Sequence, residues 1–146
     1  MDYEKNLIHD EEDVRRVVRQ SRRVAVLGIK TEAQSDQAAF YVPRYLADAG
    51  VEVVPVPVYY PEVKEILGRP VYRRLSDIPG DIDLVDVFRR PADIDQHVDD
   101  LIAKKPKAVW FQLGITNDAA AKKLAQAGIE VVQNRCLMVD HRRYGH

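Results

Sequence analysis

The sequence predicts an α/β domain built on a parallel sheet, and three observations support this prediction. First, five apolar runs rich in β-branched residues recur along the 146 residues. Second, these runs are nearly continuous rather than alternating, as expected for strands buried on both faces of a sheet. Third, segments with helical spacing separate the runs, and such strand-helix-strand units build a three-layer sandwich with right-handed crossovers. The predicted strands are Arg23–Gly28, Val51–Val58, Asp83–Phe88, Ala108–Leu113 and Ile129–Gln133.

The predicted fold class is a Rossmann-like three-layer sandwich with a five-stranded parallel sheet in the order 3-2-1-4-5. A flavodoxin-like order is the alternative, because sequence alone separates these two orders poorly. We expect a single domain over residues 1–146, since this length suits one compact core. Val14, Val17 and Val18 have helical spacing, so a short amphipathic helix within residues 1–20 is expected to pack on the domain.

Helix boundaries follow from capping and stop signals. Ser35 or Asp36 is the expected cap of a helix that ends at Gly50. Pro43 lies inside that stretch and predicts a kink or a later helix start. Asn117 is the expected cap of a later helix. The remaining predicted helices are Glu62–Leu67, Ala92–Lys105 with Pro91 in its first turn, Asp118–Ala127 and Leu137–Arg143.

Composition limits the classes of partner. The formal net charge is −1 and the isoelectric point is about 6.4, so nucleic acid is not favoured as a partner and any anion must be bound by locally placed cations. Cys136 is the only cysteine, so no intrachain disulfide can form. The first residues are charged and no apolar run of eighteen residues occurs, so we expect no signal peptide, no membrane association and a cytoplasmic location.

The third predicted strand leads into the strongest candidate site, Phe88-Arg89-Arg90-Pro91. In an open α/β sheet, ligands bind just beyond the carboxyl ends of the strands. An aromatic ring next to two guanidiniums suits a nucleotide with phosphates, because guanidiniums pair bidentately with oxyanions. A solvated turn before a helix is the alternative, and Asp86 could pair with Arg89 or Arg90.

The other strand ends add candidate ligand contacts. After the first strand, backbone N–H groups at Gly28 and Ile29 would join the Lys30 ammonium in an anion site, with hydroxyl donors from Thr31 and Ser35. The alternative is that Gly28 only permits a tight turn. After the second strand, a base could rest on apolar residues, although these residues could instead cover the sheet edge. The candidates there are Val56, Pro57, Val58 and Tyr59.

The fourth strand ends near Gln112 and Gly114, and Gln112 could hydrogen-bond ligand amides or orient the first loop. An NAD(P)-binding oxidoreductase or redox sensor is a less favoured alternative. Its G-x-G-x-x-G fingerprint needs three glycines, of which only Gly28 is present, and no acidic residue ends the second strand.

No catalytic constellation is evident, so binding is favoured over enzyme activity. His97 lies in a predicted helix among aspartates, where a solvated face is the simpler interpretation. Cys136, His141 and His146 give only a faint metal-site pattern, and no metal is expected.

Several segments resemble the CoA-binding protein family, small domains similar to the N-terminal domain of the succinyl-CoA synthetase α subunit. The segments occur in order over about residues 20 to 142. They are Val26-Leu27-Gly28, Val54-Pro55-Val56, Glu65-Ile66-Leu67-Gly68, Asp83-Leu84-Val85-Asp86-Val87-Phe88-Arg89-Arg90-Pro91, Val109-Trp110-Phe111-Gln112-Leu113-Gly114-Ile115 and Asn134-Arg135-Cys136.

This resemblance implies that coenzyme A or an acyl-CoA binds across the strand ends. The family's loops map onto Gly28–Ser35, Val56–Tyr59 and Phe88–Pro91. Two kinds of protein partner are considered: a second copy of the chain in a homo-oligomer, or an acyl-CoA enzyme on which the chain docks as a non-catalytic subunit. In the first loop the chain has Gly28-Ile29-Lys30, where the family usually has Gly-Ala-Ser.

Overall fold

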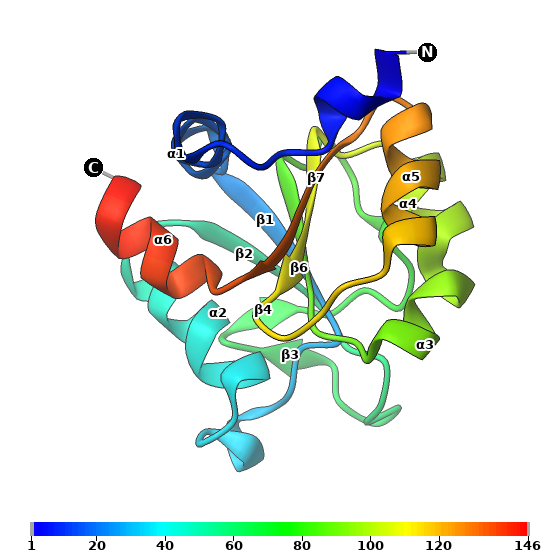
Figure 1. Cartoon of the computed structure of the whole chain (residues 1–146). Coiled ribbons are helices and arrows are strands. Elements are labelled where there is room, and N and C mark those ends of the chain that lie inside the picture. The colour runs from blue at the N-terminus through cyan, green and yellow to red at the C-terminus, as the bar shows by residue number, and fades with distance from the viewer. Residues whose placement is uncertain (1, 146) are drawn as a thin grey trace.

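A five-stranded parallel sheet forms the middle layer of the computed structural model, which describes residues 2–145 (Figure 1). The strand order is β2-β1-β5-β6-β7. All four strand pairs are parallel, so the carboxyl ends of the five strands share one edge of the sheet. The strands are β1 (Arg23–Leu27), β2 (Glu52–Val56), β5 (Leu84–Val87), β6 (Ala108–Gln112) and β7 (Glu130–Arg135).

Helices cover both faces of this sheet. Figure 1 shows α1, α2 and α6 on one side and α3, α4 and α5 on the other. The α-helices are α1 (Glu11–Gln20), α2 (Ala38–Asp48), α3 (Pro91–Ile94), α4 (Val98–Lys104), α5 (Asp118–Gln126) and α6 (Leu137–Tyr144). The 3-10 helices are η1 (Asp2–Asn6), η2 (Glu32–Gln34), η3 (Leu75–Asp77) and η4 (Asp95–His97).

Alternation along each strand fills two apolar layers. In β1, Ala25 and Leu27 belong to the cluster that packs against α3, α4 and α5. Val24 and Val26 belong to the cluster beneath α1, α2 and α6. All four side chains are buried, which confirms that a continuous apolar run marks a strand covered on both faces.

The Rossmann-like α/β class with a five-stranded parallel sheet is confirmed. Counted over the five parallel strands alone, the order is 2-1-3-4-5, because β5 pairs with β1 where the predicted order placed it beside β2. The position outside β2 is taken by a hairpin of β3 (Glu65–Ile66) and β4 (Arg69–Pro70). The chain after β4 hydrogen-bonds to β2, since Tyr72 N–H donates to the Pro55 carbonyl at 3.0 Å. If this hairpin is counted as the third element, the six elements have the order 3-2-1-4-5-6, which begins with the predicted 3-2-1-4-5.

The prediction of a helix at Glu62–Leu67 is wrong. Leu67 and Gly68 both have positive φ, 55° and 70°, and they form the two-residue turn of the β3–β4 hairpin. Turns with two positive-φ residues match the twist of antiparallel strands. Gly68 therefore belongs to a hairpin turn.

The start of α2 also differs from the prediction. Thr31, rather than Ser35 or Asp36, provides a cap, and it caps the 3-10 turn η2; α2 itself begins at Ala38 after Gln37. Asn117 caps α5 as predicted, accepting the Ala120 N–H at 3.0 Å.

Pro43 lies inside α2 and changes the hydrogen-bond partner of a backbone carbonyl in the helix. A helical proline has no N–H for the carbonyl four residues earlier, here Ala39. That carbonyl accepts the Lys30 N–H at 3.1 Å instead. The proline therefore frees an acceptor that ties the loop after β1 to α2.

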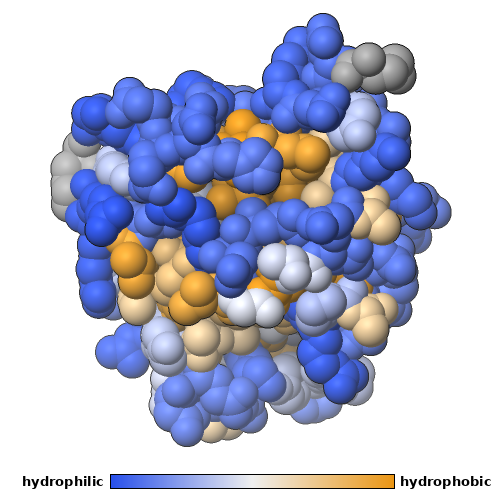
Figure 2. All heavy atoms as spheres, viewed as in Figure 1, coloured by the Kyte–Doolittle hydropathy of each residue, from blue (hydrophilic) through white to orange (hydrophobic). Residues whose placement is uncertain are grey.

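The amino-terminal segment packs along the opposite side of the sheet from β2. As predicted, Val14, Val17 and Val18 of α1 are buried, and Arg16 forms an ion pair of 2.6 Å with Glu130 of β7. Leu7 forms a parallel bridge with Val131 of β7. Figure 2 shows apolar residues at the surface around this bridge, on a face that is otherwise mainly hydrophilic. Among residues 2–145, no helix combines the length and the apolar character needed to cross a bilayer.

Candidate functional site

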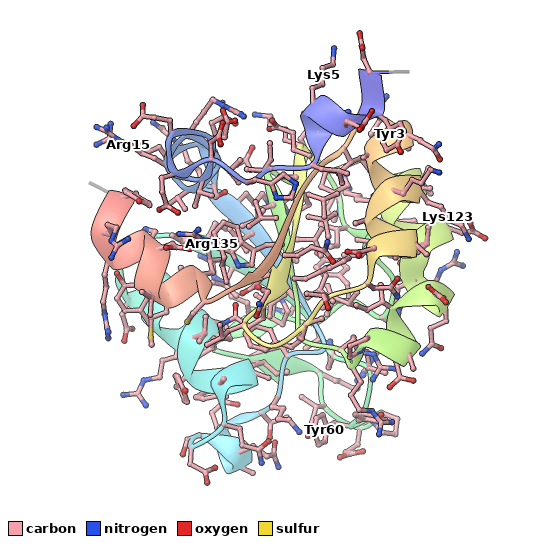
Figure 3. The ribbon with its side chains drawn as sticks, viewed as in Figure 1. Tyr3, Lys5, Arg15, Tyr60, Lys123 and Arg135 are labelled. Atoms are coloured by element: carbon pink, nitrogen blue, oxygen red, sulfur yellow. The ribbon has the colours of Figure 1, made fainter. Side chains whose placement is uncertain are left out.

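A cavity of about 250 Å³ opens where the chain leaves β1, β2 and β5. Figure 3 shows Tyr60 at this end of the molecule, opposite Tyr3 and Lys5. The volume is below the roughly 300–1,000 Å³ of a typical small-molecule pocket, so the cavity suits one part of a larger ligand. Its lining residues are Gly28, Ile29, Lys30, Tyr59, Tyr60, Phe88, Arg89, Arg90 and Asp93.

Gly28 brings the loops after β1 and β5 into direct contact. Its φ is +87°, and a Cβ at this position would lie 2.3 Å from the Phe88 carbonyl oxygen. Its N–H donates to the Val56 carbonyl at 2.9 Å. The glycine thus permits the tight turn that the sequence analysis gave as the alternative. The contact that it allows between the two loops also forms part of the cavity lining.

Most N–H groups of the first loop are bonded within the protein. Lys30 N–H donates to Ala39, and Thr31 N–H donates to the Gln34 side chain at 3.1 Å. Thr31 is buried and Ile29 is 1% exposed. None of the ion pairs within residues 2–145 involves Lys30, so its ammonium is the group of this loop that can serve an anion.

Arg89 is a nearly buried cation with neutral partners. Arg89 as a whole is only 9% exposed. Its Nε donates to Nε2 of His97 at 3.2 Å, and its Nη1 donates to the Tyr59 hydroxyl at 3.3 Å. The guanidinium carbon also lies 5.6 Å from the centre of the Tyr59 ring. Buried charges are normally paired, so an unneutralised guanidinium at a cavity wall is suited to an anionic ligand.

Arg90 has the opposite character, although it is the next residue. Its side chain is 84% exposed, and Nε lies 3.0 Å from Oδ2 of Asp93. Arg90 therefore lines the cavity with a side chain that is largely in solvent. Asp86 pairs with neither arginine, which corrects the pairing considered from the sequence.

The loop after β2 is held in place by Arg73. The Arg73 guanidinium donates to three backbone carbonyls, those of Tyr59 at 3.0 Å, Tyr60 at 2.8 Å and Val63 at 2.8 Å. Tyr60 has a φ of 62°, a left-handed conformation that costs a residue with a side chain about 1–2 kcal/mol. The three bonds stabilise this conformation, which places two tyrosine rings in the cavity wall.

Seven of the fifteen predicted site residues line the cavity; the other eight do not. Val56 and Pro57 are buried, and Val56 and Val58 pack in the core cluster. Gln112 is buried, and its Oε1 accepts the Leu137 N–H at 3.3 Å, so it orients α6 rather than the first loop. The residues outside the cavity are Thr31, Ser35, Val56, Pro57, Val58, Pro91, Gln112 and Gly114.

Asp86 is a buried carboxyl group in the middle of β5. It is 0% exposed, and neither oxygen has a hydrogen-bond partner among the described residues. Burial raises the pKa of this carboxyl well above its ordinary value. Burial therefore favours the neutral form of this carboxyl group.

Three residues of this area were not among the predicted site residues. Tyr60 follows the predicted Tyr59, and Asp93 is three residues after Arg90, a spacing at which side chains meet on a helix. His97 contacts Arg89 across eight residues, so the solvated-face interpretation of His97 is wrong. No local pattern shows this contact, because it depends on how the 3-10 turn η4 interrupts the helix after β5.

A larger cavity of about 500 Å³ lies at the other end of the sheet. The carboxyl ends of α1, α2 and α6 meet there, at Ser21, Gly50 and Gly145. Helix carboxyl ends carry partial negative charge, which offsets the positive charge that Arg19 and Arg22 bring to this cavity. The smaller cavity, with its buried guanidinium, is the better anion site.

The cysteine and histidines near the carboxyl terminus have structural positions. Cys136 precedes α6, and Nδ1 of His141 lies 3.0 Å from the Tyr45 hydroxyl. His146 lies outside the described residues. Within residues 2–145, no three His, Cys, Asp or Glu side chains are grouped to hold a metal ion.

Comparison with known proteins identifies the family. A family model described as a CoA binding domain matches residues 22–142. The chain belongs to this CoA-binding domain family. It is 30% identical over 129 residues to the Bacillus subtilis (strain 168) protein YneT, covering 88% of this chain and 92% of that protein.

Solved structures share this fold. A Thermus thermophilus protein, cell-free ID.343, superposes with a TM-score of 0.84 at 36% identity, covering 93% of this chain and 99% of the other. The dinucleotide-forming acetyl-coenzyme A synthetase 1 of Ca. Korarchaeum cryptofilum has a TM-score of 0.66 at 16% identity. That match covers 78% of this chain and 26% of the synthetase, and at this identity it shows a shared fold.

Proposed function

We propose that this CoA-binding domain binds coenzyme A or an acyl-CoA at the carboxyl ends of β1, β2 and β5, with no chemistry of its own. The observation that carries the proposal is the Arg89 guanidinium, which is 9% exposed, has neutral partners and lies in the cavity wall. Lys30 lines the same cavity, so two cations from different loops can engage a diphosphate. The Tyr59 and Tyr60 rings, 6.3 Å apart, add aromatic surface for a base.

The composition of the cavity supports a binding role. Its lining residues include no serine, cysteine or histidine, the side chains that nucleophilic catalysis most often uses. NAD is less well suited, because Lys30 stands where the dinucleotide fingerprint needs a glycine. The end of β2 also offers Val56 and Pro57 where NAD-binding proteins have an acid for the ribose.

Isothermal titration calorimetry of the whole chain tests this proposal. We expect saturable binding of CoA, weaker binding of dephospho-CoA and adenosine 3′,5′-bisphosphate, and weaker binding still of NAD. When acyl-CoA is incubated with the protein in water, or together with common acyl acceptors, the acyl-CoA should be recovered unchanged. Tighter binding of NAD than of CoA, or no heat with CoA, would falsify the proposal.

A second proposal concerns the protein partner. The fold of this chain corresponds to about a quarter of the synthetase chain, which supports a role as a separate CoA-binding subunit that docks on an acyl-CoA enzyme. Affinity purification from cells, followed by identification of stoichiometric partners, tests this second proposal. Recovery of the chain alone, as a monomer or homo-oligomer, would argue against it.

A further inference from the structure

Arg89 is held by an imidazole where a buried arginine usually has a carboxylate. The Arg89 Nε to His97 Nε2 distance is 3.2 Å, and the Tyr59 hydroxyl lies 3.3 Å from Nη1. No ion pair within residues 2–145 includes Arg89. The fold therefore fixes this side chain with two uncharged groups.

The chemistry of this contact determines the protonation state and the tautomer of His97. A guanidinium has only donors, so Nε2 of His97 must offer a lone pair and the imidazole proton must be on Nδ1. A carboxylate at this position would cancel the arginine charge, whereas a neutral imidazole orients the guanidinium and leaves its full charge for a ligand.

We propose that His97 is a positioning residue for the anion site: its neutral imidazole holds Arg89 in the geometry that binds a phosphate of the ligand. The role rests on the proposed CoA-binding function. His97 itself lies behind Arg89 and is not among the residues that line the cavity.

The charges around His97 favour its neutral form. Burial and the nearby Arg89 lower the pKa of His97, while Asp100 and Asp93 act in the opposite direction. Both carboxylates are otherwise engaged, Asp93 with Arg90 and Asp100 with the N–H groups of Leu75 and Ser76. Protonation of His97 on acidification removes its lone pair and places two cations side by side, so the hold on Arg89 is lost.

Two substitutions separate positioning from packing. The variant His97→Gln retains an acceptor oxygen for Arg89 Nε, while His97→Leu keeps a side chain of similar bulk without an acceptor. His9→Gln is the control, since His9 is exposed and lies beside β7, at the opposite edge of the sheet from β2. At pH 7 we expect His97→Leu to weaken CoA binding about tenfold or more, and His97→Gln and His9→Gln to remain within about threefold of the wild type.

The pH profile gives a second readout. Between pH 7 and pH 5 the affinity of the wild type and of His9→Gln should fall more than that of His97→Gln, which has no imidazole at this site. Titration of the CoA phosphates affects all variants alike and cancels in this comparison. A rise in wild-type affinity on acidification, relative to His97→Gln, would show that His97 binds the anion as a cation, and would overturn the positioning role.

A measurement without ligand separates this inference from the proposed function. Nitrogen-15 NMR of the imidazoles should show His97 protonated on Nδ1, with a pKa that rises in Arg89→Leu. Protonation on Nε2 would overturn the inference. If the wild type fails to bind CoA, the proposed function fails; if it binds and His97→Leu binds equally well, only the role of His97 fails.

Discussion

The loops after β1 and β5 touch each other at Gly28 and Phe88, yet they use their polar groups differently. The backbone N–H groups of the first loop donate hydrogen bonds within the protein, to the Val56 and Ala39 carbonyls and to the Gln34 side chain. The second loop presents Arg89, a buried cation with neutral partners. The comparison shows that the backbone donors of the first loop fix the shape of the cavity, whereas the second loop supplies its buried charge. Each prediction below alters one side of this comparison.

The largest effect is expected from Gly28→Ala, which breaks the contact between the two loops. The added Cβ meets the Phe88 carbonyl oxygen at 2.3 Å, in addition to the cost of about 1–2 kcal/mol for a left-handed backbone. Gly50→Ala is a matched control, because Gly50 has a φ of +95° and no atom within 4 Å of its Cβ position. In urea unfolding, Gly28→Ala should lose clearly more stability than Gly50→Ala, and equal losses would contradict the contact.

Asp86 tests the strand that carries the second loop. Burial raises its folded-state pKa, so the unfolded chain ionises first as pH rises above about 4. The free energy of unfolding should then fall by about 1.4 kcal/mol per pH unit until the folded-state pKa is reached. Asp86→Asn removes this slope, so the variant should gain stability relative to the wild type as pH rises above about 4.

Asp83 serves as a control of opposite sign at the start of the same strand. Burial opposes its ionisation, but the Arg23 N–H, the Lys107 ammonium and other contacts outweigh burial and lower its pKa. Asp83→Asn should therefore cost stability at neutral pH, and the cost should shrink as pH falls below about 4. If the difference in the free energy of unfolding between each variant and the wild type stays constant with pH, these assignments are contradicted.

The two adjacent arginines should contribute unequally to ligand binding. Arg89→Ala removes a buried charged donor and should cost about 1.5–3 kcal/mol of binding free energy, roughly 10- to 150-fold in the Kd for CoA. Arg90→Ala should change the Kd by less than about threefold, because Arg90 is exposed and paired with Asp93. Calorimetry on both variants decides, and equal losses would place the two side chains in equivalent positions.

The smallest effect is expected from Pro43→Ala, which sharpens the role of the first loop. The new N–H can donate to the Ala39 carbonyl and compete with Lys30 N–H for it. Hydrogen exchange at the Lys30 amide should become faster, while the Gln34 amide, bonded to Thr31, serves as an internal reference. Unchanged protection at Lys30 would show that the helix does not hold the loop through this carbonyl.

The layers of the fold could be predicted because burial leaves a strong signal in the sequence. Continuous runs such as Val24–Leu27 and Leu84–Val87 are covered on both faces, and each predicted strand is within two residues of the observed one. The β3–β4 hairpin escaped prediction because each of its strands has two residues, too few for any periodicity, and only Ile66 is buried among them.

The candidate site could be predicted in its location but not in its internal contacts. The rule that ligands bind beyond strand ends led to Lys30, Arg89 and Arg90, all of which line the cavity. The rule does not distinguish the buried Arg89 from the exposed Arg90, because two adjacent arginines have the same local sequence. That distinction arises from tertiary contacts with Tyr59 and His97.

The bridge between Leu7 and Val131 has a consequence for the rest of the chain. It lies on the outer side of β7, where Ile8 N–H takes up the Val131 carbonyl at 2.9 Å. An uncovered edge strand is a template on which other molecules can add strands and aggregate. A version trimmed to begin at residue 22 would keep every residue of the cavity and still be expected to precipitate, because the segment that shields this border would be missing.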